Sequence, residues 1–288
     1  MTRTFGFLGF MIAAVLLRGA QAADLQVPKQ VVAGNAFSIP TSGSGEASFY
    51  LQGPGSASKR KVQLGNAIEV AEEETRDAGR YIATVCSSDG CNGADFFVTA
   101  SGPAHLSFLV HPSRVPVATN DAITATAFVF DKFHNLVLQP VKVEFRVSLK
   151  DAPEVARAET TSNGVAWMSM NSSHKGGLAQ VTASSGDILE KRVVQQVPSD
   201  ACNLRIRAVR TGKFINVETD PVRDCSGNPV PDGTIVSITQ VTDKGKTTVD
   251  TPIKRGVAKA QLPEAGNATI SVASGVAIGN EVRVGGAQ

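Results

Sequence analysis

The sequence predicts an all-β chain made of several sandwich-like domains. Short runs that alternate apolar and polar residues recur from residue 23 onward, as in 141–147 and 179–183, and a period of two marks strands with one buried face. Glycine, proline, asparagine, aspartate and serine separate these runs, and no ten-residue stretch has the apolar spacing of an amphipathic helix. Many short strands with regular turns are typical of sandwiches and barrels.

The composition is that of a folded chain with little net charge. Of its 288 residues 42% are hydrophobic, which is too many for a disordered chain. The formal net charge is +2, and Arg3 and Arg18 account for it. The remainder carries 26 basic and 26 acidic residues, so we expect no nucleic-acid partner.

The first 22 residues have the pattern of a cleaved signal peptide. Arg3 supplies the positive start, residues 5–17 form an apolar run, and Ala20-Gln-Ala22 fits the cleavage pattern, which makes Ala23 the expected mature start. The run is shorter than the roughly 20 apolar residues that cross a bilayer. An uncleaved signal-anchor is the alternative. We expect an exported chain that does not span the membrane directly.

Four cysteines allow three disulfide pairings, and export permits disulfides. Cys86 and Cys91 flank a Ser-Ser-Asp-Gly turn between two β-rich stretches, so their thiols should face each other across a hairpin end. Cys202 begins one β-like run and Cys225 ends the next. A zinc site with four cysteine ligands is the rival interpretation, but the wide separation of Cys202 and Cys225 argues against it. We expect the pairs Cys86–Cys91 and Cys202–Cys225.

The chain contains an internal repeat. Three motifs occur twice in the same order, at residues 131–137 and 224–230, 164–170 and 256–262, and 177–186 and 266–275. Their offsets of 93, 92 and 89 residues correspond to a whole domain and not to a solenoid unit. We therefore expect a signal peptide at 1–22 and three domains at 23–101, 103–198 and 200–288.

The repeated domains resemble the bacterial immunoglobulin-like domain of the invasin/intimin group. The resemblance rests on a Thr-rich strand that ends in Asp, an Asn loop, a Gly-Val-Ala strand and a Val-Thr-Ala strand, here at 123–131, Asn135, 164–166 and 181–183. Residues 200–288 have a better loop, Gly227-Asn-Pro-Val230, but a poorer first strand. The resemblance implies an immunoglobulin-like sandwich, a bacterial source and a role in adhesion, although such domains often serve as stalks.

The first domain lacks that repeat but carries Asp77-Ala-Gly79-Arg-Tyr81. This segment resembles the Asp-x-Gly-x-Tyr run before the penultimate strand of immunoglobulin domains. Antibody-type domains place a cysteine two residues after the tyrosine, where this chain has Ala83, so we expect no inter-sheet disulfide there. The fold prediction is thus three tandem immunoglobulin-like β-sandwiches after a cleaved signal peptide.

The sequence predicts no enzyme, no cofactor and no metal site. It contains no nucleophile elbow, His-Glu-x-x-His motif or phosphate loop. The four histidines share one domain but not the spacing of ligands on one element: His105, His111, His134 and His174. Aspartates and asparagines gather in two loops, as calcium ligands or as turn formers: Asp131, Asn135, Asp224, Asn228 and Asp232. The sequence does not decide between calcium binding and turn formation for these loops.

An aromatic patch is the candidate interaction site. In the third domain, Lys259 marks the solvated face of its strand, and the repeat places Trp167 at the same position. The resemblance implies that Ile123, Ala125, Ala127 and Val129 form the inward set of a strand that neighbours this one in the immunoglobulin-type sheet. Phe128 and Phe130 then face outward, and Leu109 on the first strand is the fourth candidate. A bulge that rotates a strand and sends the rings inward is the alternative.

The function predicted from the sequence is that of an exported, non-enzymatic tandem protein in surface interaction, adhesion or spacing. We expect it in the secreted fraction, at the cell surface or in the periplasm of a bacterium. Its partner would be a protein or glycan at the cell surface, or a second copy. Two alternatives remain, a structural subunit that self-assembles into a filament or coat, and a carbohydrate-binding module.

Overall fold

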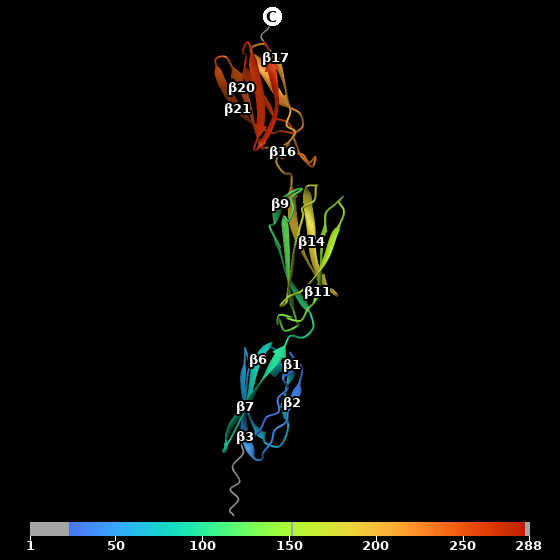
Figure 1. Ribbon diagram of the computed structural model, residues 1–288, viewed down its shortest axis with the longest axis vertical. Helices are drawn as coiled ribbons and strands as arrows, with labels where there is room; N and C mark the ends of the chain where they lie inside the picture. The colour runs from blue at the N-terminus through green and yellow to red at the C-terminus, as the bar shows by residue number, and fades with distance from the viewer. Residues whose placement is uncertain (1–22, 151, 286–288) are drawn as a thin grey trace, which may run out of the picture. The chain divides into compact units, whose positions relative to one another are not determined.

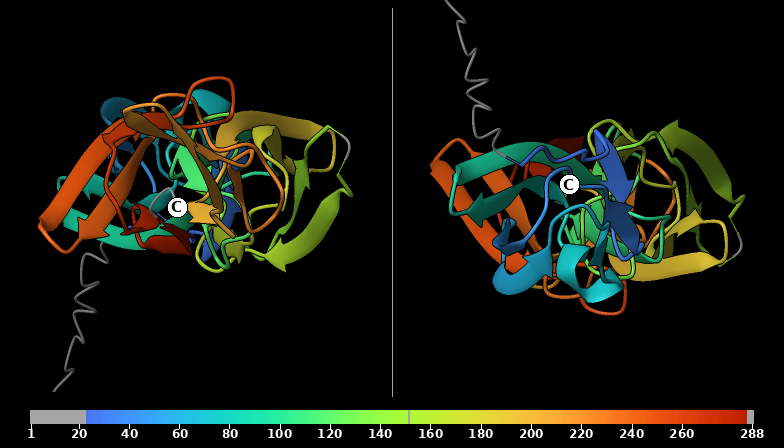
Figure 2. Two further views of the ribbon diagram at one scale, coloured as in Figure 1. Left: turned by 90° about the horizontal axis from the view of Figure 1, so that it is seen from above. Right: turned by 90° about the horizontal axis from the view of Figure 1, so that it is seen from below.

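The computed structural model describes residues 23–150 and 152–285 (Figure 1), and Figure 2 gives two further views of the same strands. The predicted signal peptide lies outside the described residues. Strands make up the regular structure, and the 3-10 segment Glu72–Thr75 is the one helical element among the described residues. The all-β prediction is confirmed. The chain divides between Ser101 and Gly102 into two compact units, which are described separately below.

The first unit holds one sandwich, called the first domain. One sheet has the strand order β1-β7-β6-β3-β4 and the other pairs β2 with β5. The strands are β1 (Gln30–Val32), β2 (Phe37–Ile39), β3 (Glu46–Gln52), β4 (Ala57–Gln63), β5 (Ile68–Val70), β6 (Gly79–Ser87) and β7 (Gly90–Thr99).

Tyr81 organises the core of the first domain. It is buried, and its ring stacks on Phe96 with 5.5 Å between the ring centroids. A β-carbon added at Gly53 would lie 2.2 Å from the Tyr81 ring, so only glycine allows the backbone this close. Phe37, on a strand of the other sheet, packs edge-on against Phe96 with 5.4 Å between the ring centroids. The Asp-x-Gly-x-Tyr segment therefore packs the two sheets together.

The second unit holds two sandwiches, called the middle and third domains. In the middle domain a sheet of order β13-β10-β8 faces one of order β12-β11-β14-β15-β9. The strands are β8 (His105–His111), β9 (Arg114–Pro116), β10 (Ile123–Phe130), β11 (Lys142–Ser148), β12 (Val155–Thr160), β13 (Val165–Met170), β14 (Gly177–Ser185) and β15 (Ile188–Val197).

Strict alternation on β10 builds the middle core. The buried residues of β10 are Ile123, Ala125, Ala127 and Val129, and those between them are half-buried. Across the core Phe108 on β8 meets Phe145 on β11, with 6.1 Å between the ring centroids. The small alanines of β10 leave room for these rings between the sheets.

The third domain repeats this plan. A sheet of order β17-β18-β22 faces one of order β21-β20-β23-β24, and β16 pairs with β19. The strands are β16 (Ala201–Cys202), β17 (Ile206–Thr211), β18 (Phe214–Thr219), β19 (Arg223–Asp224), β20 (Ile235–Thr242), β21 (Gly245–Pro252), β22 (Lys259–Pro263), β23 (Ala268–Ser274) and β24 (Ala277–Val284). Its core is one cluster of buried aliphatic residues.

The sibling domains differ after their first strand. In the middle domain the chain leaves β8 and changes sheets, so that β9 runs parallel to β15. In the third domain β17 passes directly into β18 through a tight turn. There the side chain of Arg210 donates hydrogen bonds to the carbonyls of Ala265, Gly266 and Gly285, at 2.7, 3.1 and 2.7 Å. In the third domain the Arg210 guanidinium thus binds the backbone just after β24, whereas in the middle domain β9 pairs with the end of β15.

Both disulfides form within single domains. Cys86 and Cys91 are paired residues of the β6–β7 hairpin, with 4.0 Å between their Cα atoms. Cys202 on β16 bonds Cys225, which follows β19, with 5.0 Å between the Cα atoms. No cysteine among the described residues is free. The second bridge fastens the start of the third domain to its 224–228 loop.

The two disulfides should contribute unequally to stability. The chain-entropy model assigns about 3 kcal/mol to the bond between Cys202 and Cys225, which are 23 positions apart, and about 2 kcal/mol to that between Cys86 and Cys91, which are 5 positions apart. The β6–β7 hairpin already holds Cys86 and Cys91 together, which lowers the contribution of their disulfide further. Urea unfolding of the two double Cys→Ser variants measures both values. An equal loss, or a larger loss for the hairpin pair, would contradict this expectation.

Candidate functional site

The outer face of the β8-β10-β13 sheet is the candidate functional site. The face consists of the side chains that these three strands turn away from the core. Thr126 on the central strand is paired with Leu109 on one side and with Trp167 on the other. Trp167 is 64% exposed and Leu109 58% exposed. The side chains of Trp167 and Leu109 are therefore exposed to solvent, and they lie on either side of Thr126.

The phenylalanines lie further along the same face. Phe128 is paired with Val165 and Ser107, and Phe130 is paired with His105. Both rings are half-buried. The structure therefore turns all four candidate residues away from the core. It places Trp167 directly opposite Thr126, however, and not opposite a phenylalanine, and Leu109 lies on the far side of Thr126.

The same face in the third domain is charged. Trp167 and Lys259 are matched by the repeat, and Lys259 is paired with Glu218, which in turn is paired with Arg207. The row Leu109–Thr126–Trp167 of the middle domain thus corresponds to Arg207–Glu218–Lys259. One backbone arrangement carries an uncharged row in one sibling and an ionised row in the other.

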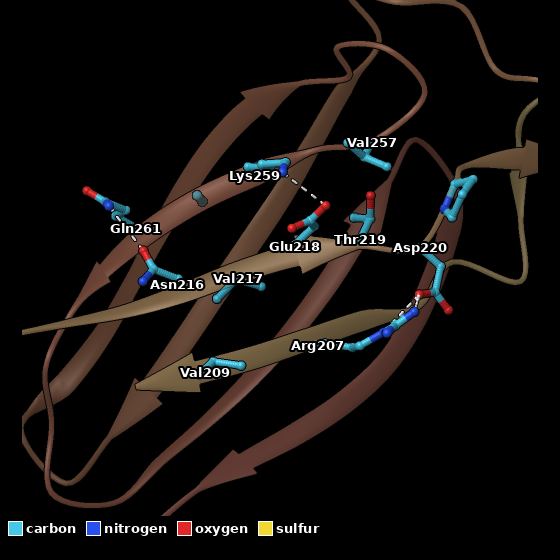
Figure 3. Close-up of a pocket in the computed structure, with 12 residues that line it drawn as sticks. Arg207, Val209, Asn216, Val217, Glu218, Thr219, Asp220, Val257, Lys259 and Gln261 are labelled. Carbon is cyan, nitrogen blue, oxygen red and sulfur yellow. Dashed lines mark hydrogen bonds and ion pairs between the residues drawn. The ribbon is translucent and has the colours of Figure 1, made fainter. Parts of the chain in front are cut away.

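A shallow groove of about 680 Å³ lies over this charged face (Figure 3). Its polar side chains bind one another across the strands. Arg207 Nε donates to Asp220 Oδ1 at 3.1 Å, Lys259 Nζ lies 3.1 Å from Glu218 Oε1, and Gln261 Nε2 donates to Asn216 Oδ1 at 3.0 Å. Each carboxylate in the groove therefore has a cation beside it. The groove contains no aromatic side chain.

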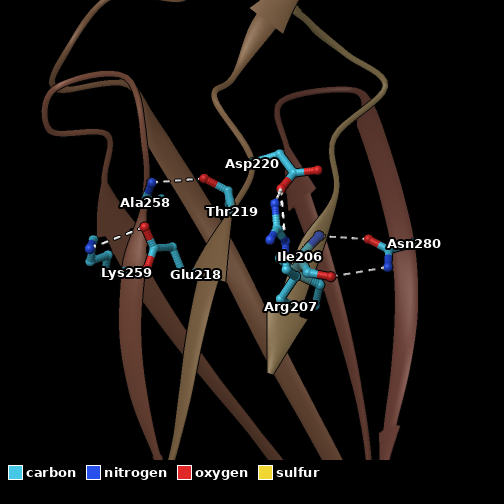
Figure 4. A network of polar contacts seen from close by, with 8 residues as sticks. All are labelled: Ile206, Arg207, Glu218, Thr219, Asp220, Ala258, Lys259 and Asn280. Carbon is cyan, nitrogen blue, oxygen red and sulfur yellow. Dashed lines mark hydrogen bonds and ion pairs between the residues drawn. The ribbon is translucent and has the colours of Figure 1, made fainter. Parts of the chain in front are cut away.

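Three further hydrogen bonds join segments of the third domain near this groove (Figure 4). Thr219 Oγ1 accepts a hydrogen bond from the Ala258 backbone N–H at 2.9 Å. Asn280 on β24 accepts from the Ile206 N–H at 2.7 Å and donates to the Ile206 carbonyl at 3.2 Å, so that it joins the two sheets at their seam. The face is a rigid, internally paired surface.

The groove is not predictable from the sequence pattern. Lys259 served only to define the wet side of its strand. Alternation on β17 and β18 would have placed Arg207 and Glu218 on the same side, but the pairing register that makes them neighbours comes from the folded sheet.

The aspartate–asparagine loops are closed by their own backbones. Asp131 Oδ1 accepts from the N–H groups of Phe133 and Asn135, both at 2.9 Å. Asp224 Oδ1 accepts likewise from Ser226 and Asn228, at 2.9 and 2.8 Å. Among the described residues, no group of three or more His, Cys, Asp or Glu side chains is arranged to hold a metal ion. These contacts favour the turn-forming role of both loops.

The histidines occupy separate positions in the middle domain. His105 stacks on His134 with 5.2 Å between the ring centroids, and His111 is exposed at the end of β8. His174 Nδ1 lies 3.4 Å from Ser226 Oγ. The structure brings only the first two together.

Asp224 has a lowered pKa. Its burial raises the pKa, but hydrogen bonds from the Asn228 side chain and from the backbone N–H groups of Asn228, Ser199 and Ser226 outweigh that effect. Exposed Asp232 also has a lowered pKa, because the N–H groups of Arg255 and Gly256 bind its carboxylate. Both groups favour the folded state in their charged form.

The third domain should lose stability in acid through Asp224. Because its folded pKa lies below the unfolded value of about 3.9, the stabilisation is complete above that pH and is lost as pH falls through the folded pKa. Acid titration of unfolding between about pH 5 and 2 should show a shallower decline for Asp224→Asn than for the unaltered protein. Asp243→Asn, in an exposed turn, is the control and should leave the decline unchanged. Identical acid profiles for Asp224→Asn and the unaltered protein would contradict this role.

Trp167 should be dispensable for folding. Trp167→Lys introduces the residue that the third domain carries at the matched position, and we expect it to change the free energy of unfolding by less than about 1 kcal/mol. Phe108→Ala removes a fully buried ring and should cost about 3–5 kcal/mol. Denaturant unfolding of both variants makes the comparison. A loss of several kcal/mol for Trp167→Lys would mean that the ring supports the core.

Comparison with known proteins identifies the fold. No family model matches the chain, and no curated protein matches it. Among solved structures it is similar to the Escherichia coli adhesin FdeC, with 14% identity, a TM-score of 0.62, and 93% of this chain aligned to 96% of that one. The fold is that of bacterial tandem immunoglobulin-like proteins. The predicted resemblance to the invasin group is thereby confirmed at the level of the fold.

Two other structures support the same conclusion. Invasin, a bacterial integrin-binding protein, aligns over 92% of this chain with 12% identity and a TM-score of 0.53. This chain spans 60% of the invasin chain. InvD of Yersinia pseudotuberculosis aligns over 92% of this chain and 98% of its own, with 10% identity and a TM-score of 0.50. At such low identity the likeness concerns the fold and not the ligand.

Proposed function

We propose that this chain is an exported, non-enzymatic bacterial protein that acts in surface interaction or adhesion. Its contact surface is the outer face of the β8-β10-β13 sheet. The observation that carries the proposal is the difference between siblings, because the fold accepts Arg207 and Lys259 where the middle domain exposes Leu109 and Trp167. Two exposed apolar side chains on one uncharged face, which the fold does not require, favour a role in binding.

General properties of binding surfaces support this proposal. Contiguous exposed apolar patches on water-exposed proteins mark interaction sites, whereas single exposed apolar residues need no explanation. Tryptophan is enriched among the residues that dominate binding energy. A β-sandwich also holds such side chains in fixed positions, since its strands are paired on both sides of β10. The face is therefore suited to recognition and not to bond-breaking chemistry.

The covalent structure supports export. Both cysteine pairs form disulfides, which persist in oxidising compartments such as the periplasm and the cell exterior. No helix within 23–150 or 152–285 has the length and apolar character to cross a membrane. The proposed location is the secreted fraction, the cell surface or the periplasm of a bacterium, and the proposed partners are a surface protein, a surface glycan or a second copy.

Self-assembly is a second candidate, favoured by one observation. Every residue of the edge strand β12 is exposed, and its outer edge has no paired strand among the described residues. Unprotected edges can pair with another chain. Sedimentation over a range of concentrations separates the two proposals, since assembly would raise the sedimentation coefficient with concentration.

The adhesion proposal makes a direct prediction for surface binding. The double variant Leu109→Arg/Trp167→Lys installs two residues of the third domain, and it should weaken binding of the protein to its target cells at least tenfold. Val209→Lys is the matched control, because Val209 is 63% exposed on the equivalent face of the third domain. Flow cytometry with labelled protein starting at Ala23 measures the binding.

Three outcomes would argue against the proposal. Unchanged binding by the double variant would move the contact surface elsewhere. Equal weakening by Val209→Lys would show that the assay senses surface charge in general. If the protein is a monomer and binds no cell surface, the adhesion proposal fails and the sandwiches act as spacers.

A further inference from the structure

The outer face of the β8-β10-β13 sheet has the chemistry of a saccharide platform. We propose that it binds a short, electrically neutral oligosaccharide, with Trp167 as the stacking surface. This inference rests on the proposed function and names the partner class for the same face.

The charge of the face selects a neutral partner. The three strands β8, β10 and β13 contain no Asp, Glu, Lys or Arg at any position. The matched face of the third domain has Arg207, Glu218 and Lys259 in a single row. Apart from His105 and His111 at the ends of β8, these strands offer a charged ligand no ion-pair partner, although the ligand would lose hydration there. Electrostatic complementarity favours a ligand without charge.

The polar groups beside Trp167 and Leu109 are hydroxyls that are free to bind a ligand, and the imidazoles of His105 and His111 lie at the two ends of β8. Thr124, Thr126, Ser107 and Ser169 all face outward, and their hydroxyls make no hydrogen bond to any described residue. In the third domain the residues matched to Thr124 and Ser169 are Asn216 and Gln261, which bind each other. The middle face thus keeps its donors and acceptors open, whereas its sibling uses them internally.

An indole ring beside open hydroxyls matches the two surfaces of a sugar ring. A pyranose presents C–H groups on its flat sides and hydroxyl groups around its rim. The C–H groups can pack on the exposed ring of Trp167, while the rim hydroxyls exchange hydrogen bonds with Thr126 and its neighbours. Binding sites commonly combine such an apolar surface with a few polar groups that fix orientation.

The size of the face argues against a second copy as the occupant. Three strands spaced about 4.8 Å apart, each contributing roughly 20 Å of length, give a footprint on the order of 300 Å². A stable protein interface buries about 800 Å² on each partner. A second copy bound through this face alone would be held too weakly to persist. A ligand of a few sugar rings is matched to the available area.

The single tryptophan of the chain provides the readout. Trp167 is the only tryptophan among the 288 residues, so a change in intrinsic emission reports on this face alone. The protein starting at Ala23 should show a saturable change in tryptophan emission with at least one of maltotriose, cellotriose and tri-N-acetylchitotriose. A printed array of neutral and acidic glycans extends the panel.

Variants separate stacking from hydrogen bonding. On the array, Trp167→Lys should lose at least tenfold in binding, Trp167→Phe should retain part of it, and Thr126→Val should lose several-fold. The tryptophan emission of Thr126→Val should still respond at higher sugar concentrations. Val209→Lys is the control and should bind like the unaltered protein. Equal binding by Trp167→Lys would overturn the stacking role.

Two results would overturn the saccharide proposal. One is the absence of saturable binding to every neutral glycan, and the other is a preference for acidic glycans. If cell binding is still lost in Leu109→Arg/Trp167→Lys while no neutral sugar competes for it, the partner is a protein and only the saccharide proposal fails. If that double variant binds cells normally, the proposed function fails as well.

Discussion

The alternation of side chains along β10 is the constraint on which the middle domain depends. Its four inward residues are fully buried between the two sheets, so the strand cannot slip by one residue without exposing all of them. That register also decides what faces the solvent. Thr126 is fixed between Leu109 and Trp167 because Ala125 and Ala127 are fixed in the core. The candidate site is therefore a consequence of core packing and needs no loop to form it.

The two sibling domains show how one scaffold carries two kinds of surface. Core positions keep their apolar character, as in Met168 and Ala260. Outward positions at the same places in the sheet change from apolar to ionised. Exposed ion pairs such as that of Lys259 and Glu218 contribute only about 0–1 kcal/mol, so neither surface is demanded by stability. The siblings therefore differ in the chemistry that each face presents to the solvent.

The parts of the fold that follow from local pattern were predictable, and the parts set by long-range pairing were not. The alternation around Trp167 and Lys259 predicted these strands and their solvent-exposed faces. The turn before Cys91 predicted the Cys86–Cys91 disulfide. Sequence alone does not show that the chain changes sheets after β8, because β9 pairs with residues about 80 positions away. The contacts of Arg210 and Asn280 likewise join segments that only the folded sandwich brings together. The ion pairs of the groove depend on register in the same way.

The third domain also serves as an internal reference for the tryptophan. If an aromatic ring at this position were needed to shield the sheet, the third domain would need one too. Its backbone pairs in the same manner with a lysine there, and the ammonium group of that lysine lies 3.1 Å from Glu218 Oε1. Tryptophan is costly to leave in water because its ring is large and apolar. The core enforces a register that holds this ring in solvent, and the fold does not need the ring there; both facts support the proposal that a ligand covers it.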